Sequence, residues 1–241
     1  MLQSIESTNS HLLQQAILTG RAKLCLSESQ SAGRGRRGND WQSAPYRNIM
    51  MSLSWGFDHW PETITGLGLA VSLVVAEQLN QAVLPATAER VTIKWPNDLM
   101  SGKDKLGGIL IDVAGEASGA CNVVIGLGLN VHQPDWSSNG DYHWQDLHSL
   151  GVDVTRNHLA ALLASELVQL LTEFSDVGFA PMSDRWNALN AYAGKLIRVG
   201  AANDYVEGVM LGVDSSGALL LEDKCSVTHR LSDSNASVRL V

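Results

Sequence analysis

Hydrophobic and polar residues alternate along parts of the chain in the pattern of strands. This pattern predicts strands at 22–28, 48–55 and 90–96, the last stopping at its proline, which removes a backbone donor and keeps the preceding residue extended. Two longer apolar runs, 105–115 and 121–131, are separated by a short turn. They predict a hairpin with both faces largely covered.

Two segments in the first third have the spacing of helices. Ser7, Thr8 and Asn9 can cap a first helix, which is expected to run to about Thr19. A core helix is expected over 62–84, because the apolar run within it is shorter than the roughly 20 residues that a membrane-spanning helix requires. We therefore expect no transmembrane segment. The N-terminus also lacks the pattern of a secretory signal.

The pattern changes towards the C-terminal end. Thr155 caps a long helix whose leucines recur at i, i+3 and i+4, and residues 179–190 predict a shorter helix. Short strands separated by turn clusters follow, and they predict a small barrel of five strands. We place a boundary near Ala193, which divides the chain into domains 1–192 and 193–241.

Composition narrows the function classes. The chain has 241 residues, is 45% hydrophobic and has a formal net charge of −8, so a sizeable core is expected but not a general nucleic-acid or membrane-surface binder. Cys25, Cys121 and Cys225 lie scattered in apolar, strand-like runs, which indicates reduced core thiols in a cytoplasmic protein. The histidines lack metal-ligand spacing, so no protein metal cluster is expected. Residues 132–150 are interpreted as a solvated surface insertion.

Positive charge is concentrated in a glycine-rich stretch, Ser31–Trp41, which holds Arg34, Arg36 and Arg37. It fits G-x-G-x-x-G, but the polar, proline-interrupted sequence after it contradicts a dinucleotide site, and no Walker A motif occurs. A solvated loop is the simpler alternative. Glycines let backbone amides approach a ligand, and arginines present planar donor forks to carboxylates and phosphates. We therefore expect a loop that closes over an anion.

A second group of polar residues lies further along the chain. Lys94 is expected near a strand end, with Asn97 and Asp98 at the turn that the proline enforces. Lys105 begins the next strand beside the glycine pair 107–108. Each residue alone could be a turn or surface residue. Together with the Arg/Gly stretch, they suit a bound polyphosphate and its metal.

The chain resembles the biotin protein ligases. The matching motifs, in the family's order and spacing, are ESTNS (6–10), ESQSAGRGRRGNDW (28–41), KWPNDL (94–99), KLGGIL (105–110) and VIGLGLNV (124–131). The resemblance implies an ATP- and Mg²⁺-dependent ligase that activates biotin as biotinyl-5′-AMP and transfers it to a lysine of the biotin carboxyl carrier protein of acetyl-CoA carboxylase. It also implies an α+β, class II tRNA-synthetase-like catalytic domain with a mixed sheet, and an SH3-like C-terminal β-barrel.

The resemblance further implies roles for individual residues. Around biotin it places Ser7, Thr8, Asn9, Gln30, Arg34, Gly35, Arg36, Lys105 and Gly108. Around the nucleotide it places Arg36, Trp41, Asn97, Asp98, Lys105 and Asn130, with Mg²⁺ carried by ATP near Asp98. Arg36 and Lys105 are the expected catalytic residues, because cations that follow the developing charge assist the meeting of a carboxylate and a triphosphate.

Two departures from the family pattern matter. The first motif begins within a few residues of Met1, where many relatives carry a DNA-binding domain, so no repressor function or DNA partner is expected. A glycine and an acidic residue typical of the family's C-terminus are not recognisable in 231–240, which leaves a nucleotide contact from there open.

Some alternatives remain open. Gly126 and Gly128 can mark a bulge, close strand packing or proximity to a ligand. A lipoate or octanoate ligase or transferase of the same fold is the rival enzyme, and a catalytically silent binding module is the rival from another class. Monomer and homodimer are both compatible with the sequence.

Overall fold

The computed structural model describes residues 1–241 except 17, 59–63, 116–118, 133–143, 202–203 and 233–235. Its larger part is a six-stranded sheet in the order β1-β2-β6-β5-β4-β3, and all neighbouring strands are antiparallel. The strands are Ala22–Ser27 (β1), Ile49–Phe57 (β2), Val91–Lys94 (β3), Asp98–Ser101 (β4), Asp104–Gly115 (β5) and Cys121–Leu129 (β6). In the described residues, the parallel component of the expected mixed sheet is limited to isolated bridges, such as Leu2 with Ser27.

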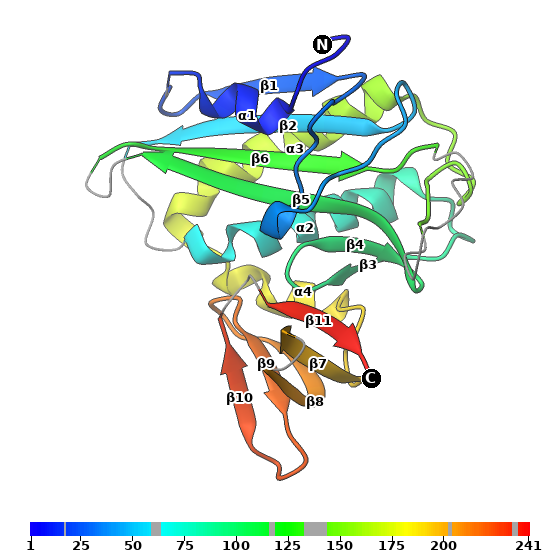
Figure 1. Cartoon of the computed structure of the whole chain (residues 1–241), viewed down its shortest axis with the longest axis vertical. Coiled ribbons are helices and arrows are strands. Elements are labelled where there is room, and N and C mark those ends of the chain that lie inside the picture. Colours follow the sequence, from blue (N-terminus) through cyan, green and yellow to red (C-terminus); the bar gives the residue numbers. More distant parts are fainter. Residues whose placement is uncertain (17, 59–63, 116–118, 133–143, 202–203, 233–235) are drawn as a thin grey trace.

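The sheet separates two layers (Figure 1). On one face, helix α2 (Leu67–Gln78) packs on β5 and β3, and helix α3 (Arg156–Val177) packs on β2. Ile109 of β5 and the odd-numbered residues of β6 belong to the main hydrophobic cluster. On the other face, the short helix α1 (Thr8–Leu13) packs through Leu12 on β1 and β6. The second face of β5 is only partly buried, so the expected coverage of both faces of the hairpin is wrong for this strand.

The core helix predicted over 62–84 is present in its described part, Ile64–Val83, while positions 62 and 63 lie outside the described residues. A 3-10 turn (Ile64–Gly66) leads into α2, and a π-helical turn follows it at Leu79–Val83. Ile64–Val83 has the length and hydropathy of a membrane span, but 56% of it is buried inside the protein. It packs on α3 and β5, which is the behaviour of a core helix.

The remaining helices follow the predictions closely. Thr155 caps α3 by accepting a hydrogen bond from the backbone N–H of His158 at 3.3 Å, and the helix ends at Gly178 with φ of 60°. Helix α4 (Ser183–Ala188) follows a 3-10 turn and buries Trp186 completely.

A smaller antiparallel sheet follows α4, with strand order β10-β9-β8-β7-β11 (Figure 1). Its strands are Leu196–Ala201 (β7), Asp204–Val213 (β8), Leu219–Glu222 (β9), Thr228–Leu231 (β10) and Ser237–Leu240 (β11), so the predicted five strands are confirmed. The main hydrophobic cluster continues into this sheet. Trp95 Nε1 also donates to the Gly217 carbonyl at 3.2 Å, which links the turn after β3 to the turn before β9.

The carboxylate of Asp214 organises the turn after β8. It accepts from Arg230 Nε at 2.6 Å, from Ser216 Oγ at 2.7 Å, and from the backbone N–H groups of Ser216 and Ala218. Burial pushes the pKa of Asp214 up, but these hydrogen bonds outweigh it and lower the pKa to about 2.

Replacement of Asp214 by asparagine is expected to destabilise the protein in a pH-dependent way. The folded-state pKa of about 2 lies below the ordinary value of 3.8, so the carboxylate stabilises the fold above pH ~4 and loses this effect as the pH falls towards 2. Urea unfolding at pH 7 should therefore show a lower free energy of unfolding for Asp214→Asn, and the difference from wild type should shrink below pH 4. A difference that does not change with pH would contradict this.

Some sequence expectations are corrected by the structure. Helix α1 ends at Leu13 and not near Thr19, because Thr19 and Gly20 pair with Gly56 of β2, and this pairing overrides the helical pattern. Asp98 was expected in a turn, but it is the first residue of β4. This strand has only four residues, which is too short a run to predict from sequence, and the turn before it is present.

The expectation that Cys225 is a core thiol is also wrong. Cys25 and Cys121 are buried in strands, as expected, whereas Cys225 is exposed in the turn between β9 and β10. That turn forms because Asp223 Oδ1 accepts the backbone N–H groups of Cys225 and Val227.

The polar segment 132–150 is only partly within the described residues. Positions 133–143 lie outside them. Leu147 is fully buried, so the end of this segment packs on the core and is not a solvated insertion throughout.

Candidate functional site

Strand register gathers the candidate residues on the α1 face of the large sheet. Ser52, Gly126 and Leu110 are direct partners across β2, β6 and β5. Two residues away, Gly128 and Gly108 are partners, and Gly108 pairs with Asp98 of β4. Directly paired residues share a face, so glycines and polar side chains from four strands line one surface.

The glycines of β6 are places where other side chains lie directly on the sheet. A Cβ at Gly126 would lie 2.4 Å from Asn9 Oδ1, and a Cβ at Gly128 would lie 2.4 Å from the ring of Trp41. The pairing of β6 with β5 is continuous at both positions. Of the three alternatives for Gly126 and Gly128, close packing is therefore observed and a bulge at these positions is not. Their proximity to a ligand stays a prediction.

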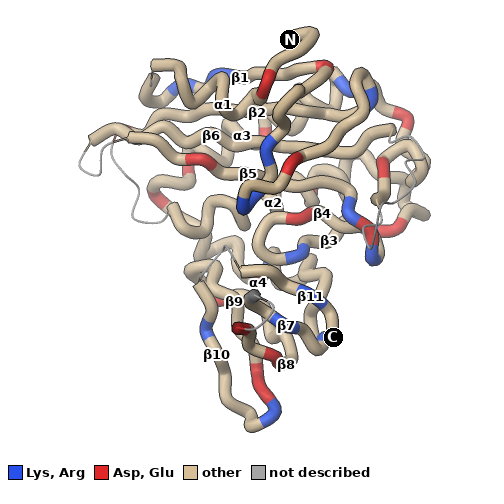
Figure 2. The backbone as a smooth tube through the Cα atoms, viewed as in Figure 1, with Lys and Arg blue, Asp and Glu red and all other residues tan. Residues whose placement is uncertain are grey.

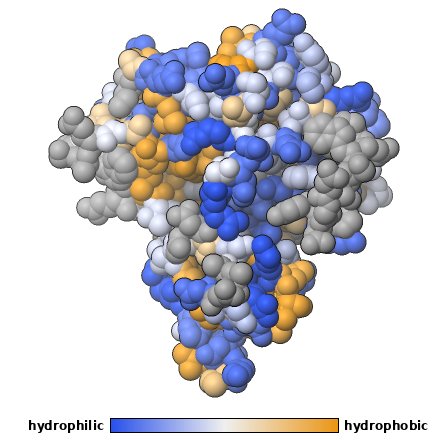
Figure 3. All heavy atoms as spheres, viewed as in Figure 1, coloured by the Kyte–Doolittle hydropathy of each residue, from blue (hydrophilic) through white to orange (hydrophobic). Residues whose placement is uncertain are grey.

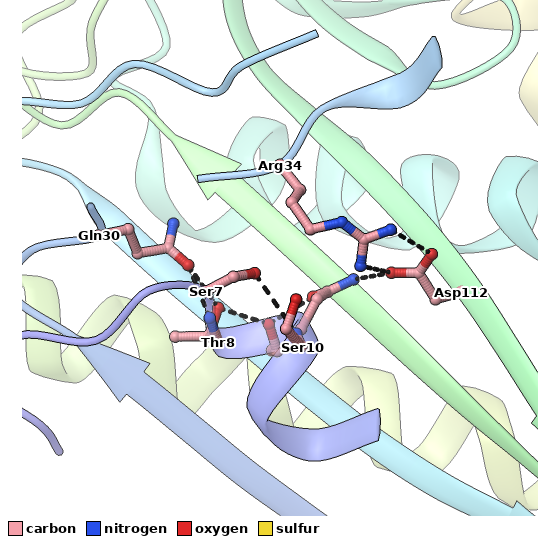
Figure 4. A network of polar contacts seen from close by, with 8 residues as sticks. Ser7, Thr8, Ser10, Gln30, Arg34 and Asp112 are labelled. Carbon is pink, nitrogen blue, oxygen red and sulfur yellow. Dashed lines mark hydrogen bonds and ion pairs between the residues drawn. The ribbon is translucent and has the colours of Figure 1, made fainter. Parts of the chain in front are cut away.

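The first group of candidate residues forms a polar network beside α1 (Figure 4). Ser7 caps the helix by accepting from the Ser10 N–H. The amide oxygen of Gln30 accepts from the backbone N–H of Thr8 at 2.7 Å and from its hydroxyl at 3.1 Å. Ser52 Oγ lies within hydrogen-bond distance of both Thr8 Oγ1 and Asn9 Oδ1. Ser7, Thr8 and Asn9 are buried, although polar, so these contacts are what satisfies them.

The network continues to the Arg/Gly stretch through Asp112 of β5. Asn9 Nδ2 donates to Asp112 Oδ2 at 2.9 Å, and Arg34 donates to both oxygens of the same carboxylate, at 2.9 and 3.2 Å (Figure 4). The side chain of Asp112 is 19% exposed and that of Arg34 is 42% exposed. A single carboxylate thus joins the buried polar network beside α1 to the Arg/Gly stretch.

The Arg/Gly stretch crosses β6 and β5 on this face (Figure 1). Hydrogen bonds from Trp41 N to Gly33 O (2.9 Å) and from Gly35 N to Asn39 O (2.7 Å) close its base. A 3-10 turn (Arg36–Gly38) forms its tip, where Arg37 has φ of 58°. No α-helix follows within the described part of this stretch, and the sheet beneath is antiparallel, which agrees with rejecting a dinucleotide fingerprint.

Arg36 reaches the second group of candidate residues. Its Nη1 donates to Asn97 Oδ1 at 2.8 Å, and the amide of Asn97 donates in turn to the Ile109 carbonyl of β5. Asn97 therefore holds the half-buried guanidinium at the edge of the sheet.

Asp98 and Lys105 form an ion pair beside it. Their side chains are 2.6 Å apart, and Lys94 lies on the other side of the carboxylate at 4.0 Å. The Lys105 ammonium also lies 5.6 Å from the centre of the Trp41 ring, a cation–π distance. Trp41 is thus neither a core residue nor a fully exposed one. Its ring packs between the glycines of the sheet and the ammonium of Lys105.

Positive charge is dense around Asp98. Burial lowers the pKa of Lys94, Asp98 opposes this, and the charges of Lys105, Arg239 and Arg37 lower the pKa further. Arg239 comes from β11 of the smaller sheet, so both sheets contribute cations. Figure 2 shows basic residues on the Arg/Gly stretch and on β3. In a chain of net charge −8, such a local concentration of cations suits an anionic ligand.

Asn130 and an aromatic pair complete this end of the site. Asn130 is buried after β6, and its Nδ2 donates to the Gln145 carbonyl at 3.1 Å and the Lys105 carbonyl at 3.4 Å. Trp144 forms a parallel bridge with Lys105 and an edge-to-face contact with Trp41, with ring centroids 6.4 Å apart. Trp144 is 39% exposed, so part of its ring is available to another planar group.

A hollow of about 530 Å³ opens beside Arg36, between the two sheets. Its walls include Arg36, Asn97 and Ile109 from the larger part and Gly217 and Arg230 from the smaller part. On the surface, hydrophilic side chains gather over this region of the molecule (Figure 3). Of the candidate residues, Arg36 and Asn97 line this hollow.

The structure brings the predicted residues into two adjoining groups. Ser7, Thr8, Asn9, Gln30 and Arg34 form the first; Arg36, Trp41, Asn97, Asp98, Lys105, Gly108 and Asn130 form the second. Sequence reasoning missed Ser52, Asp112 and Trp144. Ser52 and Asp112 are polar residues within the apolar parts of their strands, a signal that could have been noticed. Trp144 had no comparable signal, because its place depends on the fold.

Comparison with known proteins agrees with this geometry. Residues 1–130 match the model of the biotin/lipoate A/B protein ligase family. The bifunctional ligase/repressor BirA of Escherichia coli is 35% identical over 223 residues, covering 92% of this chain and 68% of the relative. A biotin–[acetyl-CoA-carboxylase] ligase of Paracoccus denitrificans is 30% identical, covering 92% of both chains. The structure of the Aquifex aeolicus biotin protein ligase in complex with biotin and ATP superimposes with a TM-score of 0.82 at 21% identity, over all of this chain and 97% of that one. The chain therefore belongs to the biotin/lipoate A/B protein ligase family.

Proposed function

We propose that the protein is an ATP-dependent biotin protein ligase, which forms biotinyl-5′-AMP and transfers biotin to a lysine of a biotin carboxyl carrier protein. The observation that carries this proposal is the juxtaposition of the polar network beside α1 with a cation-rich site, bridged by one Arg/Gly stretch through Arg34 and Arg36. The names of the relatives, several of them biotin ligases, favour biotin over lipoate.

The polar network beside α1 suits the ureido ring of biotin. A ureido group has two N–H donors and one carbonyl acceptor, so it needs fixed partners of both kinds. Thr8, Asn9 and Gln30 offer amide and hydroxyl groups whose positions are set by mutual hydrogen bonds. Such a site is expected to bind biotin with the ring on the floor and the carboxylate towards Arg36 and Lys105.

The second group of residues suits ATP. Lys94 and Lys105 supply positive charge for the phosphates, and the partly exposed Trp144 suits the base. Buried Asn130 donates to the Lys105 and Gln145 carbonyls, so we assign it to fixing the backbone beside the base. Asp98 is the carboxylate at this site, and Mg²⁺ is typically held by one or two carboxylates together with substrate phosphates. The residues therefore fit a magnesium ion carried by the nucleotide, which would neutralise phosphate charge.

The reaction requires two anions to meet. In the first step, a carboxylate oxygen of biotin attacks the α-phosphorus of ATP and pyrophosphate leaves; in the second, the lysine amine attacks the biotinyl carbonyl and AMP leaves. Arg36 and Lys105 are placed to stabilise the charge that develops at the α-phosphate. The closed Arg/Gly stretch shields the mixed anhydride from water, and the hollow beside Arg36 gives the carrier's lysine a route to it.

The finer description of the fold is part of this proposal. We assign residues 1–192 to a class II tRNA-synthetase-like catalytic domain and residues 193–241 to an SH3-like domain, which the antiparallel five-stranded sheet after α4 supports. The carrier protein is the macromolecular partner, and the proposed site of action is the cytoplasm.

Gly126→Ala is expected to weaken biotin binding and to lower the free energy of unfolding, because Asn9 is buried and hydrogen-bonded. The new Cβ would lie 2.4 Å from Asn9 Oδ1, so Asn9 must leave its place on the pocket floor. Loss of one or two hydrogen bonds to a buried ligand corresponds to about 10- to 100-fold weaker binding by isothermal titration calorimetry. Gly68→Ala is the control, since its Cβ meets only Ile111 at 3.7 Å. Unchanged affinity in Gly126→Ala would contradict the placement of the ring.

The function itself is tested by mixing the protein with Mg-ATP, a carrier domain and either biotin or lipoate, and measuring the mass of the carrier. The proposal predicts a biotinyl adduct and no lipoyl adduct. A lipoyl adduct alone would identify the rival ligase. Tight biotin binding with neither adduct nor pyrophosphate would identify a silent binding module.

A further inference from the structure

Asp112 links two parts of the site that are otherwise separate. It lies on β5, and its two oxygens receive three donors, one from Asn9 on the pocket floor and two from Arg34 on the Arg/Gly stretch (Figure 4). Floor and stretch are 25 residues apart in the chain, at positions 9 and 34. A carboxylate in this position affects how both are held.

The first consequence concerns the direction of the Asn9 amide. An ionised carboxylate only accepts hydrogen bonds, so the NH₂ group of Asn9 must face Asp112. The Asn9 oxygen then faces Ser52, as observed. Reversal of the amide would bring its oxygen against the carboxylate. Asp112 therefore determines the direction of the Asn9 amide within the polar network.

This direction makes the pocket floor rich in acceptors. Three oxygen–oxygen contacts join the side chains in the chain Asn9–Ser52–Thr8–Gln30. The hydroxyl groups of Ser52 and Thr8 supply one hydrogen each, and neither amide oxygen can donate. One contact thus lacks a hydrogen. The network therefore has more acceptors than donors, and a ligand that brings N–H donors, as a ureido ring does, can donate to an acceptor that this imbalance leaves without a hydrogen.

The second consequence concerns the Arg/Gly stretch. Arg34 engages both oxygens of Asp112 through a bidentate pair, which is stronger and more directional than a single contact. The pair holds the stretch against β5, so the charge of Arg34 is used for positioning while Arg36 reaches the cation-rich site.

We propose that Asp112 is a positioning residue that sets the donor and acceptor pattern of the ring pocket through Asn9 and holds the Arg/Gly stretch closed through Arg34. This role rests on the proposed function, because it names how that site recognises its ligand. Two separate readouts follow: ring recognition depends on Asn9, and retention of the adenylate depends on Arg34.

Asp112→Asn is expected to reduce both ring recognition and retention of the adenylate. Without the charge, the Asn9 amide can take either direction, so the affinity for biotin should fall about 10- to 100-fold. The preference for biotin over an analogue methylated at a ureido nitrogen should fall with it. Dissociation of biotinyl-5′-AMP should also accelerate. Calorimetry, adenylate release and thermal unfolding are measured on each variant.

Companion variants separate positioning from a merely structural role. Arg34→Gln should accelerate adenylate release without changing the preference for the unmethylated ring, and the double variant should release the adenylate no faster than either single variant alone. Asp112→Glu retains the charge but displaces both oxygens, so it should lower the ring preference if Asp112→Asn does not fold. Glu207→Gln is the control, because it breaks the exposed ion pair with Arg198 on the smaller sheet.

The outcomes separate this inference from the proposed function. If the wild-type protein neither binds biotin nor forms the adenylate, the proposed function fails. If the wild type does both, but Asp112→Asn and Asp112→Glu keep ring preference and adenylate release within about twofold of it, the role of Asp112 is overturned. Additive effects of Asp112→Asn and Arg34→Gln on release would overturn the proposed link to the stretch.

Discussion

Replacement of Lys105 by alanine is expected to abolish most adenylate synthesis while the protein remains folded. The Lys105 ammonium lies 2.6 Å from Asp98 and beside Trp41, at the end of the site where the cations gather. Loss of one preorganised group that stabilises developing charge typically reduces kcat about 100- to 1000-fold. Single-turnover formation of biotinyl-5′-AMP measures this loss directly.

Lys103→Ala is the matched control for Lys105→Ala. Lys103 is exposed in the turn between β4 and β5, two residues away, so its removal takes the same charge from the chain but not from the site. It should leave adenylate synthesis within about twofold of wild type, as is usual for surface charges. Normal single-turnover adenylation by Lys105→Ala would show that the assigned role is wrong.

Replacement of Arg36 by glycine is expected to release the adenylate prematurely. Its guanidinium is held by Asn97 at 2.8 Å, over the hollow through which solvent reaches the site. A charge-assisted hydrogen bond lost at a buried ligand corresponds to roughly 10- to 100-fold faster dissociation. Escaped adenylate should then biotinylate amines of unrelated proteins, which a blot with labelled streptavidin detects.

Arg37→Gly controls for the loss of a loop arginine. Arg37 is exposed and has φ of 58°, a conformation that glycine adopts without strain. This variant should retain the adenylate nearly as long as wild type and should label few unrelated proteins. Equal leakage from Arg36→Gly and Arg37→Gly would attribute retention to loop charge in general and not to the contact with Asn97.

The elements that sequence predicted well are those with a strong local signal. The leucine spacing after Thr155, the apolar hairpin of β5 and β6, and the turn-rich C-terminal strands all appear in the structure. Elements decided by distant pairing were missed or misjudged. Helix α1 is shorter than its pattern indicates because Thr19 pairs with β2, and β4 exists because it fits between β3 and β5.

The residues of the candidate site also divide into those with a local sequence signal and those decided by distant pairing. Motifs marked Arg34, Arg36 and Lys105 because their residue types are unusual in an acidic chain. The partners of these residues depend on strand register and could not be read from spacing. Register makes Asp98 a neighbour of Gly108, and it brings Asp112, which no motif contains, under Arg34.

The central claim is that cations of the Arg/Gly stretch and Lys105 allow the carboxylate of biotin and the α-phosphate of ATP to approach each other. A crystal structure of the protein with biotin and a non-hydrolysable ATP analogue tests it most directly. We predict an ordered stretch, with Arg36 and Lys105 both within hydrogen-bond distance of the carboxylate or the α-phosphate. A structure with both ligands bound and these two side chains directed into solvent would contradict the account.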